Sequence, residues 1–287
     1  MKLLSFVHQG RETWGAVVGD GAIDMQRVFP QYPTLLDYIT SESYLQAAEH
    51  VKGHSVDVHL ADITYLPVIP RPEKIVCAVR NYMDHHNEVI AAGMQRDLSA
   101  FPPLFLRVWR SQTAHQAPIV NPKVSDSLDW EAELAVIIGK PGRNIAETDA
   151  YAHVAGYSCY NDASVREWQF HAKQIASGKN FESTGGFGPW MVTADEIAPG
   201  RQLKLQCRLN GETVQDGHTG NMIFNIPQLI AYASTIFTLV PGDVIITGTP
   251  AGVGWSKKPP RFMKAGDVVE VEIEAIGTLV NRIVAGD

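Results

Sequence analysis

The chain has 287 residues and a formal net charge of −7, from 24 Lys and Arg against 31 Asp and Glu, and 45% of its residues are hydrophobic. This composition is typical of a folded globular protein and excludes a largely disordered chain. The acidic balance argues against nucleic acid as the partner, because nucleic-acid surfaces concentrate basic residues to displace counterions. It is compatible with a local Arg or Lys pocket for a small anion.

The first residues, MKLLSFVHQGRETWG, contain only a brief apolar stretch that His8, Gln9 and Arg11 interrupt. They match neither a signal peptide nor a membrane span, so we expect a cytoplasmic protein without a membrane partner. The three cysteines are far apart and form no C-x-x-C pair. Buried free thiols are therefore expected rather than disulfides or a zinc knuckle.

Residues 1–66 predict short strands at LLSFV, WGAVVG and GAIDM and a helix over about residues 35–51. The proline-rich stretch LPVIPRPEK follows, and we place a domain boundary between Pro67 and Pro72. The prediction is a small N-terminal domain, residues 1–68, and a larger domain, residues 69–287.

From Ile75 onward, short strands recur between Gly, Pro and Asp turns, with few helical stretches. They are KIVCAV, LAVIIG, HVAGYSCYN, LKLQCRLNG, GDVIITGTP and GDVVEVEIEAIGTLV. In the last one, Val269, Val271 and Ile273 alternate with glutamates, which predicts one buried and one solvated face. The fold class expected is α+β, mainly β.

The segment RNYMDHHNEVIAAG predicts a helix that ends at Gly93. His85 and Glu88 are three residues apart and would lie side by side on it. A neighbouring carboxylate orients an imidazole and raises its basicity, so this pair could act as a general base near neutral pH. The alternatives are a purely structural histidine, or His86 in its place.

In DWEAELAVIIGK, Glu131 and Glu133 stand two apart at the start of a strand and point to the same side of the sheet. Asp162 follows another strand. Three carboxylates suit Mg²⁺, Mn²⁺ or Ca²⁺, with water completing the coordination shell. The alternative is a solvated strand face, on which alternating glutamates are common.

Two further segments carry polar candidates. In ASVREWQFHAKQ, Ser164 and Glu167 fit a capping box, which would place Arg166 and Gln169 on one helix face. Lys179 lies in the glycine-rich loop SGKNFESTGGFGPW, where the backbone can approach a ligand closely. A surface ion pair for the arginine and a solvated loop position for the lysine are the alternatives.

The segment ITGTPAGVG follows a strand, and its glycines would leave backbone amides near Thr249 free to bind an anionic group. No P-loop lysine follows these glycines, which argues against a nucleotide site.

Taken in order, RNYMDHHNE, DWEAELAVIIGK, GYSCYNDASVREWQ, GKNF, GFGPW and VPGDVIITGTPAGVG resemble the fumarylacetoacetate hydrolase superfamily. The resemblance runs from about Ile75 to the C-terminus. It implies a mixed β-roll or β-sandwich catalytic domain behind a small N-terminal α+β domain, in a homodimer. It also implies roles: metal ligands Glu131, Glu133 and Asp162 for Mg²⁺ or Mn²⁺ (Ca²⁺ in crystals); catalytic residues His85, Glu88 and Lys179; substrate contacts Tyr82, Arg166, Gln169 and Thr249.

The activity that this resemblance implies first is hydrolysis of an acylpyruvate such as maleylpyruvate or fumarylpyruvate, a 2,4-dioxo acid from aromatic catabolism, to pyruvate and a carboxylic acid. Water activated by His85 would attack the distal carbonyl. Arg107, Arg110 and His115 are hypothesised to line the distal end of the pocket and to favour a second carboxylate on the substrate.

The same scaffold also hosts oxaloacetate-type decarboxylases, ureidoglycolate lyases, isomerases and hydrolases of 2,4-dioxo sugar acids. A metal-binding relative without catalytic activity is the alternative from another class, although the chain retains the full set of expected side chains. Because a fold hosts many activities, the resemblance alone leaves these alternatives open.

Overall fold

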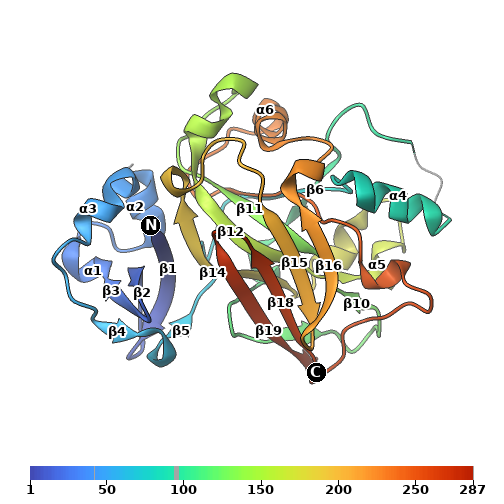
Figure 1. Ribbon diagram of the computed structural model, residues 1–287, viewed down its shortest axis with the longest axis horizontal. Coiled ribbons are helices and arrows are strands. Elements are labelled where there is room, and N and C mark those ends of the chain that lie inside the picture. Colours follow the sequence, from blue (N-terminus) through green and yellow to red (C-terminus); the bar gives the residue numbers. More distant parts are fainter. Residues whose placement is uncertain (42, 94–96, 287) are drawn as a thin grey trace.

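A computed structural model describes residues 1–41, 43–93 and 97–286. Its N-terminal part lies to one side of a larger body (Figure 1), in which two β-sheets pack face to face. The strand-rich architecture confirms the α+β, mainly β fold class.

The larger sheet has 12 strands and runs through both parts of the molecule. The main path is β4-β3-β2-β1-β14-β12-β11-β17-β6-β7, while β5 pairs with β1 and β8 with β14. These strands are β1 (Lys2–His8), β2 (Arg11–Val18), β3 (Gly21–Asp24), β4 (Val58–His59), β5 (Thr64–Tyr65), β6 (Ile75–Ala78), β7 (Leu104–Arg107), β8 (Gln112–Ala114), β11 (Ala132–Ile138), β12 (Val154–Asp162), β14 (Gly185–Thr193) and β17 (Val244–Ile246).

The second sheet has five strands in the order β16-β15-β18-β19-β9. They are β9 (Ile119–Asn121), β15 (Lys204–Leu209), β16 (Glu212–His218), β18 (Val268–Ile273) and β19 (Gly277–Ala285). The short strands β10 (Leu128–Asp129) and β13 (Ser164–Val165) pair with each other beside the larger sheet.

In the described ranges, six α-helices connect and cover these sheets: α1 (Met25–Val28), α2 (Leu35–Thr40), α3 (Ala47–His50), α4 (Met83–Ala91), α5 (Arg166–Gln169) and α6 (Ile226–Ile236). Short 3₁₀ turns lie between them: η1 (Ser43–Gln46), η2 (Leu60–Asp62), η3 (Trp109–Ser111), η4 (Glu147–His153), η5 (Ile175–Lys179), η6 (Ala194–Glu196), η7 (Thr219–Asn221) and η8 (Gly254–Ser256). Within the described residues, no helix has the length and apolar character needed to cross a membrane.

The core between the sheets explains why some strands are continuously apolar and others alternate between apolar and polar residues. All seven residues of β11 are buried, because one face of this strand meets the second sheet and the other meets the core shared with the N-terminal part. On β18, Val269, Val271 and Ile273 are each 1% exposed while the intervening residues are partly exposed, as predicted. A strand buried on both faces is continuously apolar, whereas a strand with one solvated face alternates.

Two predicted elements differ from the structure. The segment 266–280 is a hairpin of β18 and β19 rather than one strand, because the chain turns at Ala275, whose φ is 64°. The expected helix over residues 35–51 is divided into α2, η1 and α3. Its residue Glu42 lies outside the described residues. The helix around His85 does end as predicted, with Gly93 at a φ of 98°.

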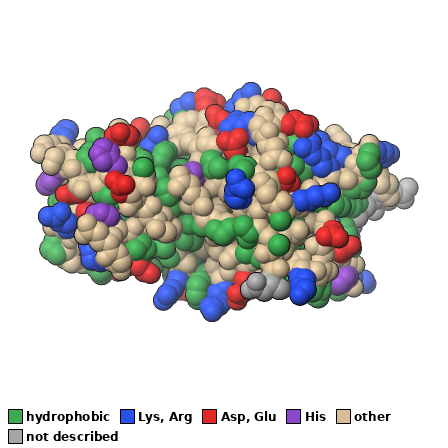
Figure 2. Space-filling view, turned by 90° about the horizontal axis from the view of Figure 1, so that it is seen from below, with side chains coloured by type: hydrophobic (Ala, Val, Ile, Leu, Met, Phe, Trp, Pro, Cys, Tyr) green, Lys and Arg blue, Asp and Glu red, His purple; other side chains and the backbone are tan. Residues whose placement is uncertain are grey.

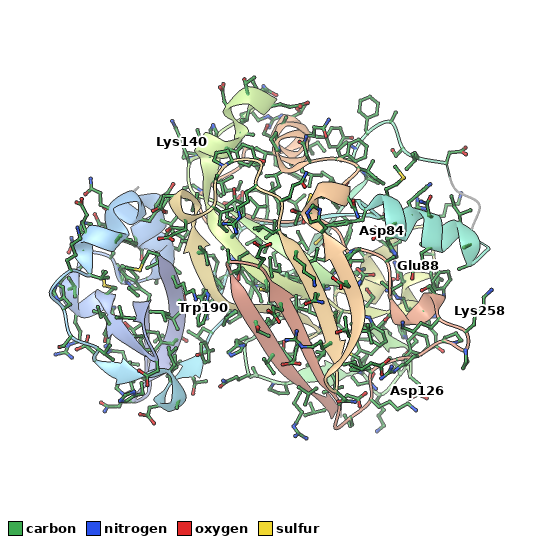
Figure 3. All side chains as sticks on the ribbon, in the orientation of Figure 1. Asp84, Glu88, Asp126, Lys140, Trp190 and Lys258 are labelled. Carbon is green, nitrogen blue, oxygen red and sulfur yellow. The ribbon has the colours of Figure 1, made fainter. Side chains whose placement is uncertain are left out.

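The N-terminal part joins the larger body through the sheet itself. Lys2 and Leu3 of β1 pair with Val192 and Met191 of β14. Trp190 lies at this junction (Figure 3), where the ammonium of Lys2 stands 4.6 Å from its ring centroid. The predicted boundary at Pro67 to Pro72 falls in the connection between β5 and β6, and it stays a prediction. Basic and acidic side chains are both spread over the face shown in Figure 2.

Candidate metal and proton-transfer site

Three carboxylates meet at one end of the paired strands β11 and β12. Glu131 directly precedes β11, Glu133 lies within it and Asp162 ends β12. One oxygen from each carboxylate lies within 4.8 Å of the others, and all three residues are buried. The structure thus brings together the set that the sequence predicted as a metal site.

Three cationic side chains surround these carboxylates. Lys179 Nζ donates to Glu131 Oε2 and to Asp162 Oδ2, each over 2.6 Å. Arg166 Nη1 lies 2.7 Å from Glu131 Oε1, and Arg107 Nη1 donates to Asp162 Oδ1. None of these side chains is more than 7% exposed. Because the ion pairs are desolvated, loss of one partner leaves a buried charge uncompensated.

Two of the carboxylates differ in their partners and therefore in their pKa. Burial raises the pKa of Glu131, but the Lys179 ammonium and the Arg166 guanidinium outweigh it and hold that pKa below its usual range. Burial, together with the neighbouring Asp162 and Glu131 carboxylates, raises the pKa of Glu133 well above its usual range. Glu133 accepts a hydrogen bond from the Gly248 amide and forms no salt bridge within the described part of the chain.

This donor set fits a divalent cation. Among the described residues, Glu133 is a buried carboxylate that forms no salt bridge and lies beside two other carboxylates, and a bound cation would offset that charge. All three donors are hard oxygens, which suit Mg²⁺ and Mn²⁺.

His85 and Glu88 lie side by side on α4, as predicted. The His85 Nδ1 atom is 2.9 Å from Glu88 Oε2. Burial raises the pKa of Glu88, but hydrogen bonds from His85, Ser256 and the Gly252 amide hold that pKa below its usual value. Figure 3 shows Asp84 and Glu88 about one turn apart on this helix. His86, the alternative candidate, faces a different and much smaller pocket.

The loop after β17 binds carboxylates of the protein itself. Its Gly252 amide donates to Glu88 Oε1 over 2.9 Å, and the Gly254 and Trp255 amides donate to the two Asp129 oxygens over 2.7 and 2.9 Å. The expectation that amides near Thr249 are free for an anionic ligand is therefore wrong for these amides. Thr249 Oγ1 donates to the Ala132 carbonyl over 2.9 Å.

A cavity of about 320 Å³ brings the candidate residues together. Its polar wall contains most of the predicted site: His85, Glu131, Glu133, Asp162, Arg166, Gln169, Lys179 and Thr249. Arg166 Nη1 donates to Gln169 Oε1 over 2.9 Å, which confirms their predicted proximity. The lining also contains apolar side chains, among them Val89, Phe105, Phe170, Val253 and Trp255, and the cationic Arg80 and Lys173.

Some predicted residues do not line this cavity. Tyr82 is fully buried in the core. Arg107 lies behind Asp162, and Arg110 stands at a separate surface cleft, 3.6 Å from Glu182. His115 packs edge-on against Tyr65, with ring centroids 4.6 Å apart. The hypothesis that Arg107, Arg110 and His115 form a distal carboxylate pocket is therefore wrong.

The predicted capping box is also wrong. Val165 precedes α5 without a capping side chain, Ser164 Oγ donates to the Asp162 carbonyl, and Glu167 accepts from Ser125.

Sequence reasoning missed Asp129, which is fully buried and accepts from Arg166 Nε over 2.8 Å. A signal was available, because Asp129 continues the two-residue spacing of Glu131 and Glu133. Ser256, which contacts Glu88, has no local signal.

The chain is similar to known proteins over most of its length. The family model described as fumarylacetoacetate (FAA) hydrolase C-terminal matches residues 74–284. The human mitochondrial protein oxaloacetate tautomerase FAHD2A is 40% identical over 282 residues, covering 96% of this chain and 87% of that protein. Oxaloacetate tautomerase YisK of Bacillus subtilis is 40% identical over 226 residues, covering 78% of this chain and 74% of its own.

Solved structures show the same likeness over the whole chain. The maleylpyruvate hydrolase of Sphingobium sp. SYK-6, in complex with manganese(II) and pyruvate, superposes with a TM-score of 0.83 at 28% identity and full coverage of both chains. A fumarylacetoacetate hydrolase from Exiguobacterium antarcticum superposes with a TM-score of 0.81 at 32% identity, again with full coverage.

Proposed function

The chain belongs to the fumarylacetoacetate hydrolase family, and we propose that within this family it is a divalent-metal-dependent oxaloacetate tautomerase. The observation that carries the proposal is the 40% identity, over nearly the whole chain, to a protein named for that activity. The cavity supports it, since it places a histidine and carboxylate pair beside an acidic triad. Acylpyruvate hydrolysis, the first expectation from the sequence, becomes the second candidate.

Tautomerisation of oxaloacetate needs a group that moves a proton between C3 and the 2-oxo oxygen. Glu88 accepts from His85 Nδ1, so this nitrogen carries the ring hydrogen and Nε2 is left as the base. In the keto-to-enol direction, His85 Nε2 takes a proton from C3, the C2=C3 bond forms and the 2-oxo oxygen becomes an enolate oxygen. Return of the proton to that oxygen gives the enol and restores neutral His85.

The remaining side chains favour an anionic 2-oxo acid. Arg166 and Lys179 bring two positive charges to the same wall as the triad, and Gln169 adds a polar contact. Glu131, Glu133 and Asp162 would hold Mg²⁺ or Mn²⁺, which when bound supplies Lewis-acid charge for the developing enolate. The apolar side chains in the lining lower the local polarity, which strengthens these charge interactions.

The test is a direct assay of tautomerisation. Purified protein with Mg²⁺ or Mn²⁺ is mixed with freshly dissolved enol-oxaloacetate, and loss of the enol absorbance in the ultraviolet is followed against a protein-free control. We expect acceleration that a chelator and His85→Gln both abolish. Release of pyruvate and CO₂ is measured in parallel, because decarboxylation of oxaloacetate in place of tautomerisation would reject the proposal.

Acylpyruvate hydrolysis is favoured by two observations. The similar maleylpyruvate hydrolase is in complex with manganese and pyruvate, and the apolar side chains in the lining here would accommodate an acyl chain. The same assay mixture with maleylpyruvate, fumarylpyruvate and acetylpyruvate separates the candidates. Pyruvate and the matching acid from these substrates, without faster oxaloacetate tautomerisation, would establish the hydrolase.

We further propose a homodimer. Leu106, Val108 and Trp109, on β7 and the turn after it, are 44%, 55% and 41% exposed, which is unusual for adjacent large apolar residues. Light scattering coupled to size exclusion distinguishes a monomer from a dimer. The cytoplasmic location stays a prediction, and the similar human protein is named as mitochondrial.

A further inference from the structure

The carboxylate of Glu88 is held from the side opposite His85. Its Oε2 faces His85 Nδ1 at 2.9 Å, while its Oε1 accepts from the Gly252 amide at 2.9 Å and from Ser256 Oγ at 2.5 Å. Ser256 Oγ also lies 2.8 Å from the Val253 carbonyl, but its single hydrogen bonds more strongly to an ionised carboxylate. Gly252 and Ser256, which are not among the residues lining the cavity, therefore orient Glu88.

The same loop holds a second part of the site. Its Gly254 and Trp255 amides bind Asp129, and Asp129 accepts from Arg166 Nε. Arg166 in turn contacts Glu131. Hydrogen bonds on both sides of the loop 252–256, its backbone and the Arg166–Glu131 ion pair therefore connect the proposed base to a proposed metal ligand.

The path of this loop requires glycine at two positions. Gly252 has a φ of 105°, and a Cβ there would stand 2.2 Å from the Val214 carbonyl oxygen. A Cβ on Gly254 would stand 1.9 Å from the Arg261 carbonyl oxygen. These carbonyl oxygens belong to the backbone and cannot move aside as the end of a flexible side chain can. Close packing therefore fixes the direction of the loop amides.

We propose that Ser256 is a positioning residue for the His85–Glu88 pair and that the loop 252–256 is a common support for this pair and for Arg166. Ser256 fixes the Glu88 carboxylate, Glu88 fixes the ring hydrogen of His85 on Nδ1, and Nε2 is thereby kept as the base. The role of Nε2 in a reaction rests on the proposed tautomerase function. The position of the His85 ring hydrogen on Nδ1 does not depend on that function.

The test compares Ser256→Ala and Ser256→Thr in the full-length protein. Loss of a hydrogen bond to a charged group predicts a kcat about tenfold lower for the alanine variant, with KM changed by less than about twofold. Threonine retains the hydroxyl and should restore kcat. Thr40→Ala is the matched control, because this residue is in the N-terminal part and its exposed hydroxyl donates only to the Leu36 carbonyl.

A second readout needs no substrate. Ring ¹⁵N chemical shifts of histidine-labelled protein distinguish a hydrogen on Nδ1 from one on Nε2, and His85→Gln identifies the His85 signals. We expect the Nδ1–H form in the wild type and in Ser256→Thr, and a mixture of forms in Ser256→Ala.

Wild-type kcat and ring shifts in Ser256→Ala would overturn the proposal, as would equal losses in the alanine and threonine variants, which would assign the effect to packing. If the shifts change as expected but the wild type does not tautomerise oxaloacetate, the positioning role stands and the proposed function fails.

Discussion

Replacement of Glu133 by glutamine should change the stability of the protein in opposite directions without and with metal. Glutamine removes the negative charge, while its Oε1 can still accept from the Gly248 amide that Glu133 now binds. Two unit charges 4.8 Å apart, the distance within which one oxygen of each carboxylate lies from the others, repel by about 3.5 kcal/mol at an effective dielectric constant of about 20. Relaxation and water reduce this value, so we expect the metal-free variant to be about 1–3 kcal/mol more stable than the wild type.

Thermal unfolding with a chelator and with saturating Mn²⁺ measures both effects. For a chain of this length, 1 kcal/mol corresponds to about 2 °C in Tm, so metal-free Glu133→Gln should unfold about 2–6 °C higher. Mn²⁺ at about 100 times its Kd should stabilise the wild type by about 2.7 kcal/mol, and the variant much less.

The exposed Glu182 provides the control, since Glu182→Gln removes the same charge outside the triad and should leave both values unchanged. A metal-free Glu133→Gln protein that unfolds below the wild type and keeps the full Mn²⁺ shift would refute the reasoning. That result would mean that Glu133 already has a compensating partner and is not a metal ligand.

Three other predictions follow from the structure. His85→Gln should lower the rate of proton transfer by about 10²–10⁴-fold and leave the Mn²⁺ affinity unchanged in calorimetry, and loss of both would contradict its role as a base. Burial lowers the pKa of His115 from 6.5 to about 4, so between these pH values the unfolded chain binds a proton at this residue and the folded chain does not. The free energy of unfolding should therefore fall by up to about 3 kcal/mol as the pH drops from 6.5 to 4. Urea titrations at several pH values should show this decrease in the free energy of unfolding for the wild type but not for His115→Asn. An equal decrease in both proteins would exclude His115 as its source. Leu134→Ala, at a buried position between the sheets, should cost about 2–5 kcal/mol with an unchanged m-value, whereas Val18→Ala at an exposed position should cost little; equal losses would contradict the assigned core.

The site residues that the sequence identified are those related by local spacing. His85 and Glu88 are three residues apart on one helix, and Glu131 and Glu133 are two apart beside one strand, so regular backbone geometry fixes their relation. Asp162 is a candidate from its place after a strand, but it reaches the two glutamates through the pairing of β12 with β11, which local spacing does not predict.

The errors concern residues whose role depends on long-range packing. Arg107 is close in sequence to Arg110 and His115, yet β7 carries Arg107 to the back of Asp162 while the other two lie elsewhere. The glycines after β17 predict amides that are free for an anionic ligand, but these amides bind Glu88, Asp129 and Glu133 of the chain itself. A sequence pattern indicates that amides are available, and only the fold decides which carboxylate reaches them first.

The charges within the site bear on the proposed binding of an anionic substrate. Four buried carboxylates, Asp129, Glu131, Glu133 and Asp162, face three cationic side chains, Arg107, Arg166 and Lys179, so the cluster carries one formal negative charge. A divalent cation would change that charge to one positive, and an anionic 2-oxo acid would then be attracted rather than repelled. The two arginines and the lysine are all needed for this positive charge, because with one fewer cationic side chain the cluster with bound metal would be neutral. This balance predicts that metal strengthens the binding of a substrate carboxylate in the cavity, which Arg80 and Lys173 also line, and competition between pyruvate and chelator would reveal this dependence.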